Sequence, residues 1–497
     1  MSKEKQSALW SKGGERHPAV HDYIISRNPA DARLVEYDIL GSKAHVSMLE
    51  SVGLLAADEK LALFEAFDEV LTNYLLGVAA EKGIKSVQRI LETDEHPLAS
   101  LRAPAYARVK AAIEHATIST DETTGLPQLD LEQVAIWQEH AFRVDHSSED
   151  VHSSVETEMT RRLGDLGKKI HTGRSRNDQI LVDMRMVCRD RISDVQNSAN
   201  RFVNTLLDFA TKHEWVPMVG FTHTQPAMPS SVGQWSSSFA EALLDDMQSL
   251  AAVAKLNNQN PLGTAAGFGT GLPINRELTT ELLGFDRVQI NPMYAQLSRG
   301  KVEAAIISNL LQVMLTLDRV ANDLVWFSSE NFRWFKVPNS LTTGSSIMPQ
   351  KRNLDIMEVL RANTAQMQAF QLQAQTVGLN LISGYNKDLK TTKSITLSAF
   401  ELAESSLEIT NLLFQHLEPV PENLAASFTT DVFATDEAYR LVLEEGMPFR
   451  EAYAHIGTNL DSVSMPDDLV ADLKKRTHLG STGNLGIDRL RSRLNQA

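Results

Sequence analysis

The stretch Ala304–Leu317, "AAIISNLLQVMLTL", contains no charged residue, no glycine and no proline. Its alanine, leucine and methionine favour a helix, and a helix without a charged face must be buried all round. A single layer of five helices would leave much of such a surface in water. The stretch therefore predicts a helix bundle that packs against other copies of the chain in a homo-oligomer.

Long segments without helix-breaking residues extend this prediction to the centre of the chain. Stretches of this length that are rich in alanine, leucine, methionine, glutamine and glutamate predict long helices rather than strands. Glycine and proline are absent from Arg174–Val216, Gln234–Asn260, Lys301–Val337, Gln350–Val377 and Tyr385–Glu418. The closely spaced turns of a β-rich fold are missing, so the predicted fold class is mainly α.

The two flanks have a different character. Residues 1–173 contain shorter helical segments, such as Val35–Val52 and Asp58–Leu76. The polar, turn-rich stretch Thr93–Asp130 predicts an excursion near residues 85–140. The C-terminal part returns to short helices and ends in a turn followed by a basic helix. The expected domains are an N-terminal helical domain over 1–173, a helix-bundle domain over 174–420 and a small helical domain over 421–497.

Composition excludes several classes of partner. The 497 residues include 48 Lys and Arg against 63 Asp and Glu, a formal net charge of −15, which argues against nucleic acid and anionic membrane. The single cysteine, Cys188, excludes an internal disulfide and fits a reducing compartment. The first residues lack an apolar signal core, and Ala304–Leu317 is shorter than the roughly 20 residues that span a bilayer. We expect a soluble, cytoplasmic protein that acts on a small molecule.

The first polar cluster, "KKIHTGRSRNDQ" at Lys168–Gln179, combines four cations and a histidine directly before a long helix. Ser175 and Asp178 have the spacing of a capping box, which places Ser175 at a helix N-terminus. Free backbone N–H groups there, with Arg176 and Asn177, predict a carboxylate or phosphate site. A solvated basic patch on the surface is the alternative.

The second cluster is "GFTHTQPAMP" at Gly220–Pro229, a loop between two long helices. Thr222, Thr224 and Gln225 flank His223 and could orient its imidazole. His223 is therefore a candidate for proton transfer, and a hydrogen-bonded structural histidine is the alternative.

The third cluster is "GSSIMPQKRNLD" at Gly344–Asp355. Pro349 predicts a helix start, with Lys351 and Asn353 in the first turn and Glu358 farther along. A cation in a first helical turn opposes the helix dipole, so this placement costs stability unless an anion joins it.

The fourth cluster, "SGYNKDLKTTK" at Ser383–Lys393, repeats the pattern: Tyr385, Lys387, Lys390 and Lys393 follow a glycine and are expected to open a long helix. Three helix starts suited to anions predict a small polycarboxylate substrate. The sequence contains no HExxH, CxxC, nucleotide-binding glycine loop or GxSxG elbow, so it predicts no metal site.

These motifs together resemble a known family. "GSSIMPQKRN" is similar to the signature of the fumarase/aspartase superfamily. Other blocks resemble the argininosuccinate lyase family of that superfamily, namely "HTGRSRNDQ", "SGYNKDL", "EDVH" at Glu149–His152, "YDILGSKAH" at Tyr37–His45, "PLGTAAGFGTGLPINRELTTELLGF" and "EEGMPFREAY". The resemblance extends from about Leu9 to Ala454, apart from the excursion.

The resemblance implies an assembly and a reaction. The subunit would have three domains, with a central five-helix bundle that forms a twenty-helix homotetramer core. Each active site would combine loops from three subunits. The reaction implied is that of a carbon–nitrogen lyase, the reversible elimination of fumarate from argininosuccinate to give arginine, without a cofactor.

The resemblance also implies roles for single residues. Ser345 would be the base, and Lys351 would stabilise the extra negative charge. His223 would protonate the leaving guanidino nitrogen, oriented by Glu358. The residues implied to hold the succinyl carboxylates are Ser175, Arg176, Asn177, Thr222 and Asn353. The residues implied to lie towards the arginine part are Asp150, Tyr385, Lys390 and Lys393.

Departures from the family pattern concentrate around the leaving group. Lys390 stands where many relatives have glutamine, residues 291–301 differ, and the serine expected before "EYD" aligns only loosely with Ser26 or Arg27. Two alternatives stay open: a superfamily lyase that releases fumarate from another N-succinyl amine, and a non-catalytic, crystallin-like structural protein. The joint presence of the candidate catalytic residues speaks against the second.

Overall fold

The computed structural model describes residues 29–84, 86–87, 96–116, 118–120, 127–145 and 150–496. Ser26, Arg27, Glu149 and part of the expected excursion lie outside these residues. The chain forms two compact units, each built from several segments. Unit 1 comprises the residues up to Arg191 with Ala254–Glu303 and Ala374–Leu397, and unit 2 comprises Ile192–Val253, Ala304–Gln373 and the residues from Ser398. The expected boundaries near 173 and 420 stay a prediction.

The elements of unit 1 are mostly short helices. They are η1 Pro29–Leu34, α2 Val35–Ser51, α3 Ala57–Lys82, α5 Ala99–Glu114, β1 Ile118–Thr120, β2 Pro127–Leu129, α6 Leu131–His140, α7 Val151–Leu163, α8 Asp165–Lys168, η2 Lys169–His171, β5 Gln259–Asn260, α11 Arg276–Leu282, β6 Arg287–Val288, α12 Pro292–Leu297 and η4 Lys387–Thr391. The strands form two-residue or three-residue ladders, β1 antiparallel to β2 and β5 parallel to β6.

Unit 2 combines long helices with short terminal ones. Its shorter elements are β3 Pro217–Thr222, β4 Gln225–Ser231, β7 Phe335–Lys336, η3 Asn339–Leu341, β8 Thr343–Gly344, β9 Arg352–Asn353, β10 Glu418–Pro419, α16 Pro421–Ala426, η5 Thr430–Phe433, α17 Ala434–Glu445, α18 Phe449–Thr458, η6 Leu460–Ser462, α19 Leu469–Leu473 and α20 Ile487–Leu494. The pairs β3–β4, β7–β10 and β8–β9 are antiparallel.

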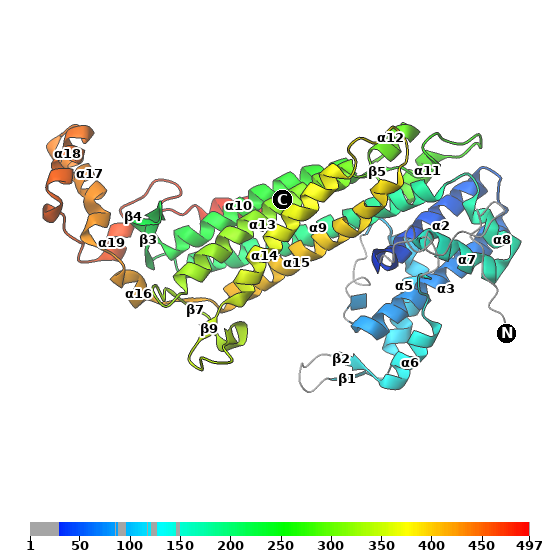
Figure 1. Cartoon of the computed structure of the whole chain (residues 1–497), viewed down its shortest axis with the longest axis horizontal. Coiled ribbons are helices and arrows are strands. Elements are labelled where there is room, and N and C mark those ends of the chain that lie inside the picture. Colours follow the sequence, from blue (N-terminus) through cyan, green and yellow to red (C-terminus); the bar gives the residue numbers. More distant parts are fainter. Residues whose placement is uncertain are drawn as a thin grey trace. The chain divides into compact units, whose positions relative to one another are not determined.

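Five long helices correspond to the five stretches without helix breakers. They are α9 Arg176–Lys212, α10 Val232–Asn257, α13 Lys301–Phe327, α14 Asp355–Thr376 and α15 Thr392–His416, and each has residues in both units. Within unit 2 these helices run side by side (Figure 1) and enclose aromatic rings: the Trp235 ring stacks on Phe414 at 5.9 Å, and Phe202 meets Phe414 edge-on at 5.4 Å. The prediction of a mainly α fold with a five-helix bundle is confirmed.

The uncharged stretch Ala304–Leu317 lies within α13, but the chain does not bury it on all sides. Ile306, Leu310 and Met314 are fully buried, whereas Leu315 is 45% exposed. A single chain therefore leaves part of this helix exposed, as predicted for one layer of five helices, because the bundle covers only part of the helix circumference. Among the described residues, the stretch Pro292–Phe327 is long and apolar enough to cross a membrane, but 56% of its most apolar window is buried within the fold, as in the core helix of a soluble protein.

The excursion contains more regular structure than expected. Residues Ala99–Glu114 form helix α5 although Pro104 lies inside it, so the turn-rich interpretation is wrong there. Leu101, Ala105 and Val109 are buried at helical spacing, and this burial outweighs the one hydrogen bond that proline removes.

A buried cluster of charges joins α5 to α2 and α9. Arg102 pairs with Glu36 at 2.6 Å and with Asp190 at 3.0 Å, and His96 lies 2.9 Å from Asp190. Burial by itself would raise the pKa of Asp190, but the His96 hydrogen bond and the charges of Arg102 and Arg189 outweigh it and lower this pKa to about 2. The ionised carboxylate therefore stabilises unit 1 at neutral pH.

The substitution Asp190→Asn tests this stabilisation. A carboxyl whose pKa is lowered on folding contributes stability above its unfolded pKa of about 3.8 and loses it as the pH falls towards 2. We expect Asp190→Asn to lower the free energy of unfolding by about 2 kcal/mol at pH 7 and by much less near pH 2.5, measured by urea titration. Asp208→Asn, which removes an exposed pair with Arg491, is the control and should change little. An equal loss at both pH values would contradict the prediction.

Candidate active site

A small cavity of about 20 Å³ in unit 1 brings together six of the nine predicted substrate-binding residues. Its lining consists of Asp150, Arg176, Asn177, Ile180, Arg299, Tyr385, Lys390 and Lys393. Four cations face one carboxylate there, although the whole chain is strongly acidic. The cavity therefore favours an anionic ligand.

Buried carboxylates hold two of these cations in place. Arg176 Nε lies 3.1 Å from Asp150 Oδ2. Asp150 caps α7, since its Oδ1 accepts hydrogen bonds of 3.0 Å from both the backbone N–H and the hydroxyl of Ser153. Lys393 forms a buried ion pair with Asp31. Fixed side chains of this kind lose little entropy when a ligand binds.

Arg299 lines the cavity although the sequence did not single it out. Its guanidinium carbon lies 5.1 Å from the centre of the Tyr385 ring, a cation–π contact that orients both side chains. Arg299 falls within residues 291–301, where the chain departs from the family pattern. The signal in the sequence was an arginine directly before Gly300, the residue that precedes the long stretch from Lys301.

Ser175 lies at the start of α9, as the capping-box spacing predicts. Its Oγ accepts from the Asn177 N–H at 3.2 Å, and its own N–H donates to Asp178 Oδ1 at 2.8 Å. The second oxygen of Asp178 accepts from the N–H groups of Gly263 and Ala265, at 2.8 and 2.9 Å. Burial raises the pKa of Asp178 to about 6, while these three N–H groups oppose the rise. Asp178 thus stabilises the start of α9, where Arg176 and Asn177 lie.

Asp178→Asn should destabilise the start of α9. Asparagine offers one oxygen, so either the Ser175 N–H or the pair from Gly263 and Ala265 would face an amide NH₂ group. We expect a loss of about 2–3 kcal/mol in the free energy of unfolding, measured by urea titration at pH 7.

Asp468→Asn is the matched control for this substitution. Asp468 caps α19 through one oxygen only, which accepts from the N–H groups of Val470 and Ala471. Asparagine can keep both bonds, so little change is expected. Equal effects of the two substitutions would contradict the role of Asp178.

Unit 2 carries the predicted proton donor on a hairpin. Thr222 ends β3, and His223 and Thr224 form the exposed turn to β4 with φ angles of 52° and 63°. Left-handed conformations at two successive non-glycine residues are unfavourable, and such strain persists where the surrounding structure imposes it. The hairpin therefore holds the His223 imidazole at its tip.

The loop with the serines forms a second hairpin. Gly344 pairs with Arg352 in the β8–β9 ladder, and Ser345 Oγ accepts N–H hydrogen bonds from Ile347 at 3.3 Å and Met348 at 3.1 Å. Two backbone dipoles thus point at the Ser345 hydroxyl oxygen. Such donors stabilise negative charge on that oxygen.

The expected helix start at Pro349 is wrong. Helix α14 begins at Asp355, so Lys351 and Asn353 precede it, while Glu358 is exposed in its first turn. The reason is the antiparallel pairing of residues 352–353 with 343–344, which satisfies backbone groups that a helix would need. Lys351 therefore does not oppose the dipole of α14 from within its first turn.

The fourth cluster also lies mostly before the long helix that it was expected to open. Residues Lys387–Thr391 form the 3₁₀ helix η4, and α15 begins only at Thr392. Tyr385, Lys387 and Lys390 therefore precede the long helix, and only Lys393 lies in its first turn.

The structure distributes the predicted site residues over the two units. Ser175 and the six predicted residues of the cavity belong to unit 1, whereas Thr222, His223, Ser345, Lys351, Asn353 and Glu358 belong to unit 2. In the described part of the chain, no hydrogen bond or ion pair joins His223, Ser345 and Glu358 to one another. The chain by itself thus presents these side chains as separate groups.

Comparisons with known proteins identify the family of this chain. A family model described as "Lyase" matches residues 76–369. Argininosuccinate lyase from Bacteroides fragilis is 35% identical over 483 residues, 97% of this chain and 93% of the relative. The chain belongs to the argininosuccinate lyase family. A second relative, argininosuccinate lyase from Sorangium cellulosum, is 38% identical, and the match covers 98% of this chain and 98% of the relative.

Solved structures show the fold of this argininosuccinate lyase family member in other lyases. A crystal structure of EDDS lyase in complex with formate has a TM-score of 0.66 at 21% identity and covers 97% of this chain and 91% of its own. Class II fumarase from Schistosoma mansoni has a TM-score of 0.59 at 16% identity. The match covers 90% of this chain and 94% of the fumarase chain. The predicted fumarase/aspartase fold is confirmed.

Proposed function

We propose that this carbon–nitrogen lyase cleaves argininosuccinate reversibly into arginine and fumarate. A base removes a proton from the carbon next to a succinyl carboxylate, and the electron pair becomes the double bond of fumarate as the C–N bond breaks. The leaving guanidino nitrogen takes up a proton. The substrate carboxylate holds the intermediate negative charge, so the residues of the chain suffice without a cofactor.

The observation that carries this proposal is the pair of N–H groups that point at Ser345 Oγ. A serine hydroxyl is a weak base unless its oxyanion is stabilised, and Ile347 and Met348 supply two donors for that purpose. Lys351 lies in the same hairpin loop and would add positive charge beside the enediolate-like carboxylate. Ser345 would thus have the stabilised oxyanion that a base needs in order to take up the proton.

The remaining roles follow from the chemistry of the side chains. His223 would protonate the leaving nitrogen, with Glu358 raising its basicity. The succinyl carboxylates would bind to residues that offer N–H, hydroxyl, amide or guanidinium donors, namely Ser175, Arg176, Asn177, Thr222 and Asn353. The arginine part would lie towards Asp150, Tyr385, Lys390 and Lys393.

A homotetramer would combine these groups into shared sites. The exposed Leu315 and Trp326 on α13, with Val359 and Leu372 on α14, give unit 2 an apolar surface that other copies could cover. Each site would then take loops from three subunits. A cytoplasmic location fits the single, buried Cys188.

The activity is tested by adding argininosuccinate to the purified protein and following the absorbance of fumarate. We expect fumarate formation, and Ser345→Ala should reduce kcat/KM by about 10²–10⁴-fold, the usual contribution of a general base. Ser346→Ala, one residue along the same loop, is the matched control and should retain most activity. Loss of activity in the control alone would remove Ser345 from the role of base, and absence of fumarate with every N-succinyl amine tested would favour the structural alternative.

The substitution Lys390→Gln tests the identity of the leaving amine. A lysine in the cavity repels a guanidinium group, so Lys390→Gln should lower KM for argininosuccinate by about fivefold, or about 1 kcal/mol, with little change in kcat. Lys387→Gln, which lies in the same cluster outside the cavity lining, should leave KM unchanged. A wild-type preference for a more anionic N-succinyl amine that Lys390→Gln reverses would identify a different substrate and retain the elimination chemistry.

A further inference from the structure

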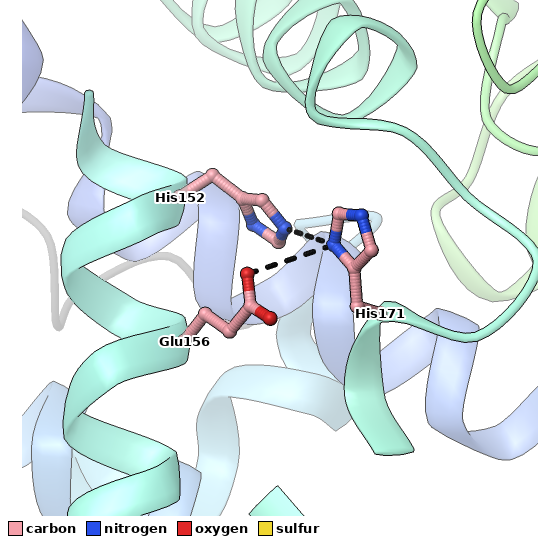
Figure 2. Close-up of side chains that lie close together, drawn as sticks. All are labelled: His152, Glu156 and His171. Carbon is pink, nitrogen blue, oxygen red and sulfur yellow. Dashed lines mark hydrogen bonds and ion pairs between the residues drawn. The ribbon is translucent and has the colours of Figure 1, made fainter. Parts of the chain in front are cut away.

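Three side chains of unit 1 converge outside the cavity just described. His152 and Glu156 lie one helical turn apart on α7, and His171 ends the 3₁₀ helix η2 (Figure 2). His152 Nε2 lies 3.4 Å from His171 Nδ1, and His171 Nδ1 lies 3.6 Å from Glu156 Oε2. Figure 2 shows the two rings and the carboxylate pointing towards one another.

These separations match the edges of a metal coordination polyhedron. In a tetrahedral zinc site with Zn–N and Zn–O bonds of about 2.0–2.1 Å, neighbouring ligand atoms lie about 3.3–3.5 Å apart. The three ligand atoms here all lie within 4.8 Å of one another, and the two short edges are close to the tetrahedral value. Only small side-chain adjustments would bring all three to one ion.

Asp38 prepares His152 for this role. The Nδ1 of His152 lies 3.0 Å from Asp38 Oδ2, and a carboxylate oxygen accepts a hydrogen, so Nδ1 carries the hydrogen and Nε2 has the free electron pair. Both side chains are fully buried. A carboxylate that fixes the tautomer of a histidine in this manner is the usual outer partner of a zinc-binding imidazole.

We propose that His152, Glu156 and His171 form a binding site for a divalent zinc ion. Two imidazole nitrogens and one carboxylate oxygen are a ligand set typical of zinc, and they leave a fourth position for water. The His171 and Glu156 side chains are 42% and 17% exposed, which gives the ion a path from solvent. The buried carboxylate of Asp38 lies behind His152 and would add negative charge near the ion to that of Glu156.

The cations nearest to the site are already engaged by other partners. Arg174 Nη1 donates to Gln179 Oε1 at 2.5 Å, and Arg176 pairs with Asp150. The charges of both arginines still act on His171 and favour its neutral imidazole, the form that binds a metal ion. A simple hydrogen-bond chain from Asp38 through His152 to His171 is the alternative explanation of the same geometry.

A bound ion would connect two segments that line the active-site cavity. His152 follows Asp150 at the start of α7, and His171 precedes the loop that leads to Arg176. Zinc would therefore stabilise the structure, because it would link the segment that carries Asp150 to the segment that carries Arg176. The sequence predicts no metal because its ligands are divided between two separate segments and match neither HExxH nor CxxC.

Zinc titration of the full-length, chelator-treated protein tests the proposal. Isothermal titration calorimetry should detect one zinc ion per chain, and zinc should raise the melting temperature. Zinc-edge X-ray absorption should show imidazole scattering with first-shell distances of about 2.0–2.1 Å. The substitutions Glu156→Gln and His171→Ala should each weaken zinc binding by at least about tenfold, with circular dichroism as the check on folding.

His455→Ala is the matched control, since it removes an exposed histidine of unit 2 and should leave the binding constant unchanged. Sub-stoichiometric binding, or binding that Glu156→Gln and His171→Ala leave unchanged, would overturn the proposal in favour of the hydrogen-bond chain. These readouts do not involve turnover, so they are independent of whether the chain cleaves argininosuccinate.

Discussion

The uncharged helix around Ala304–Leu317 imposes the main constraint on this fold. An apolar helix is stable in water only when other apolar surfaces cover it, and within unit 2 the neighbouring long helices do so for Ile306, Leu310 and Met314. Because the helices are long and lack internal breakers, the predicted site residues lie at helix starts and in the segments that connect the helices. The bundle thus determines where chemistry can occur in the chain.

The connecting segments share one kind of interaction: a buried carboxylate binds backbone N–H groups or a cation of a polar segment and holds it in place. Asp178 binds three backbone N–H groups, Asp150 caps α7 and pairs with Arg176, and Asp31 pairs with Lys393. Each carboxylate is compensated by hydrogen bonds or by a cation, as burial of charge requires. In an acidic protein this arrangement keeps a local excess of positive charge at the cavity of unit 1.

The His152 cluster extends the same principle to the surface of unit 1. Its inner end is a buried carboxylate, Asp38, and its outer end is the half-exposed His171. The cluster joins the start of α7 to the segment before α9, the two parts of the chain that also meet in the Asp150–Arg176 pair. Metal binding would thus act on the same contact that positions a candidate substrate ligand.

Helix propensity, capping and charge depend on residues close together in the chain, so they predict the helices, the capping role of Ser175 and the positive character of the loops. Other features depend on contacts that form only when the chain folds. The β8–β9 pairing displaces the start of α14 to Asp355, packing makes α5 a helix despite Pro104, and Arg299 joins the cavity through the Tyr385 ring. His171 meets His152 for the same reason: a contact between two segments depends on how the chain folds back, and no local pattern of residues encodes it.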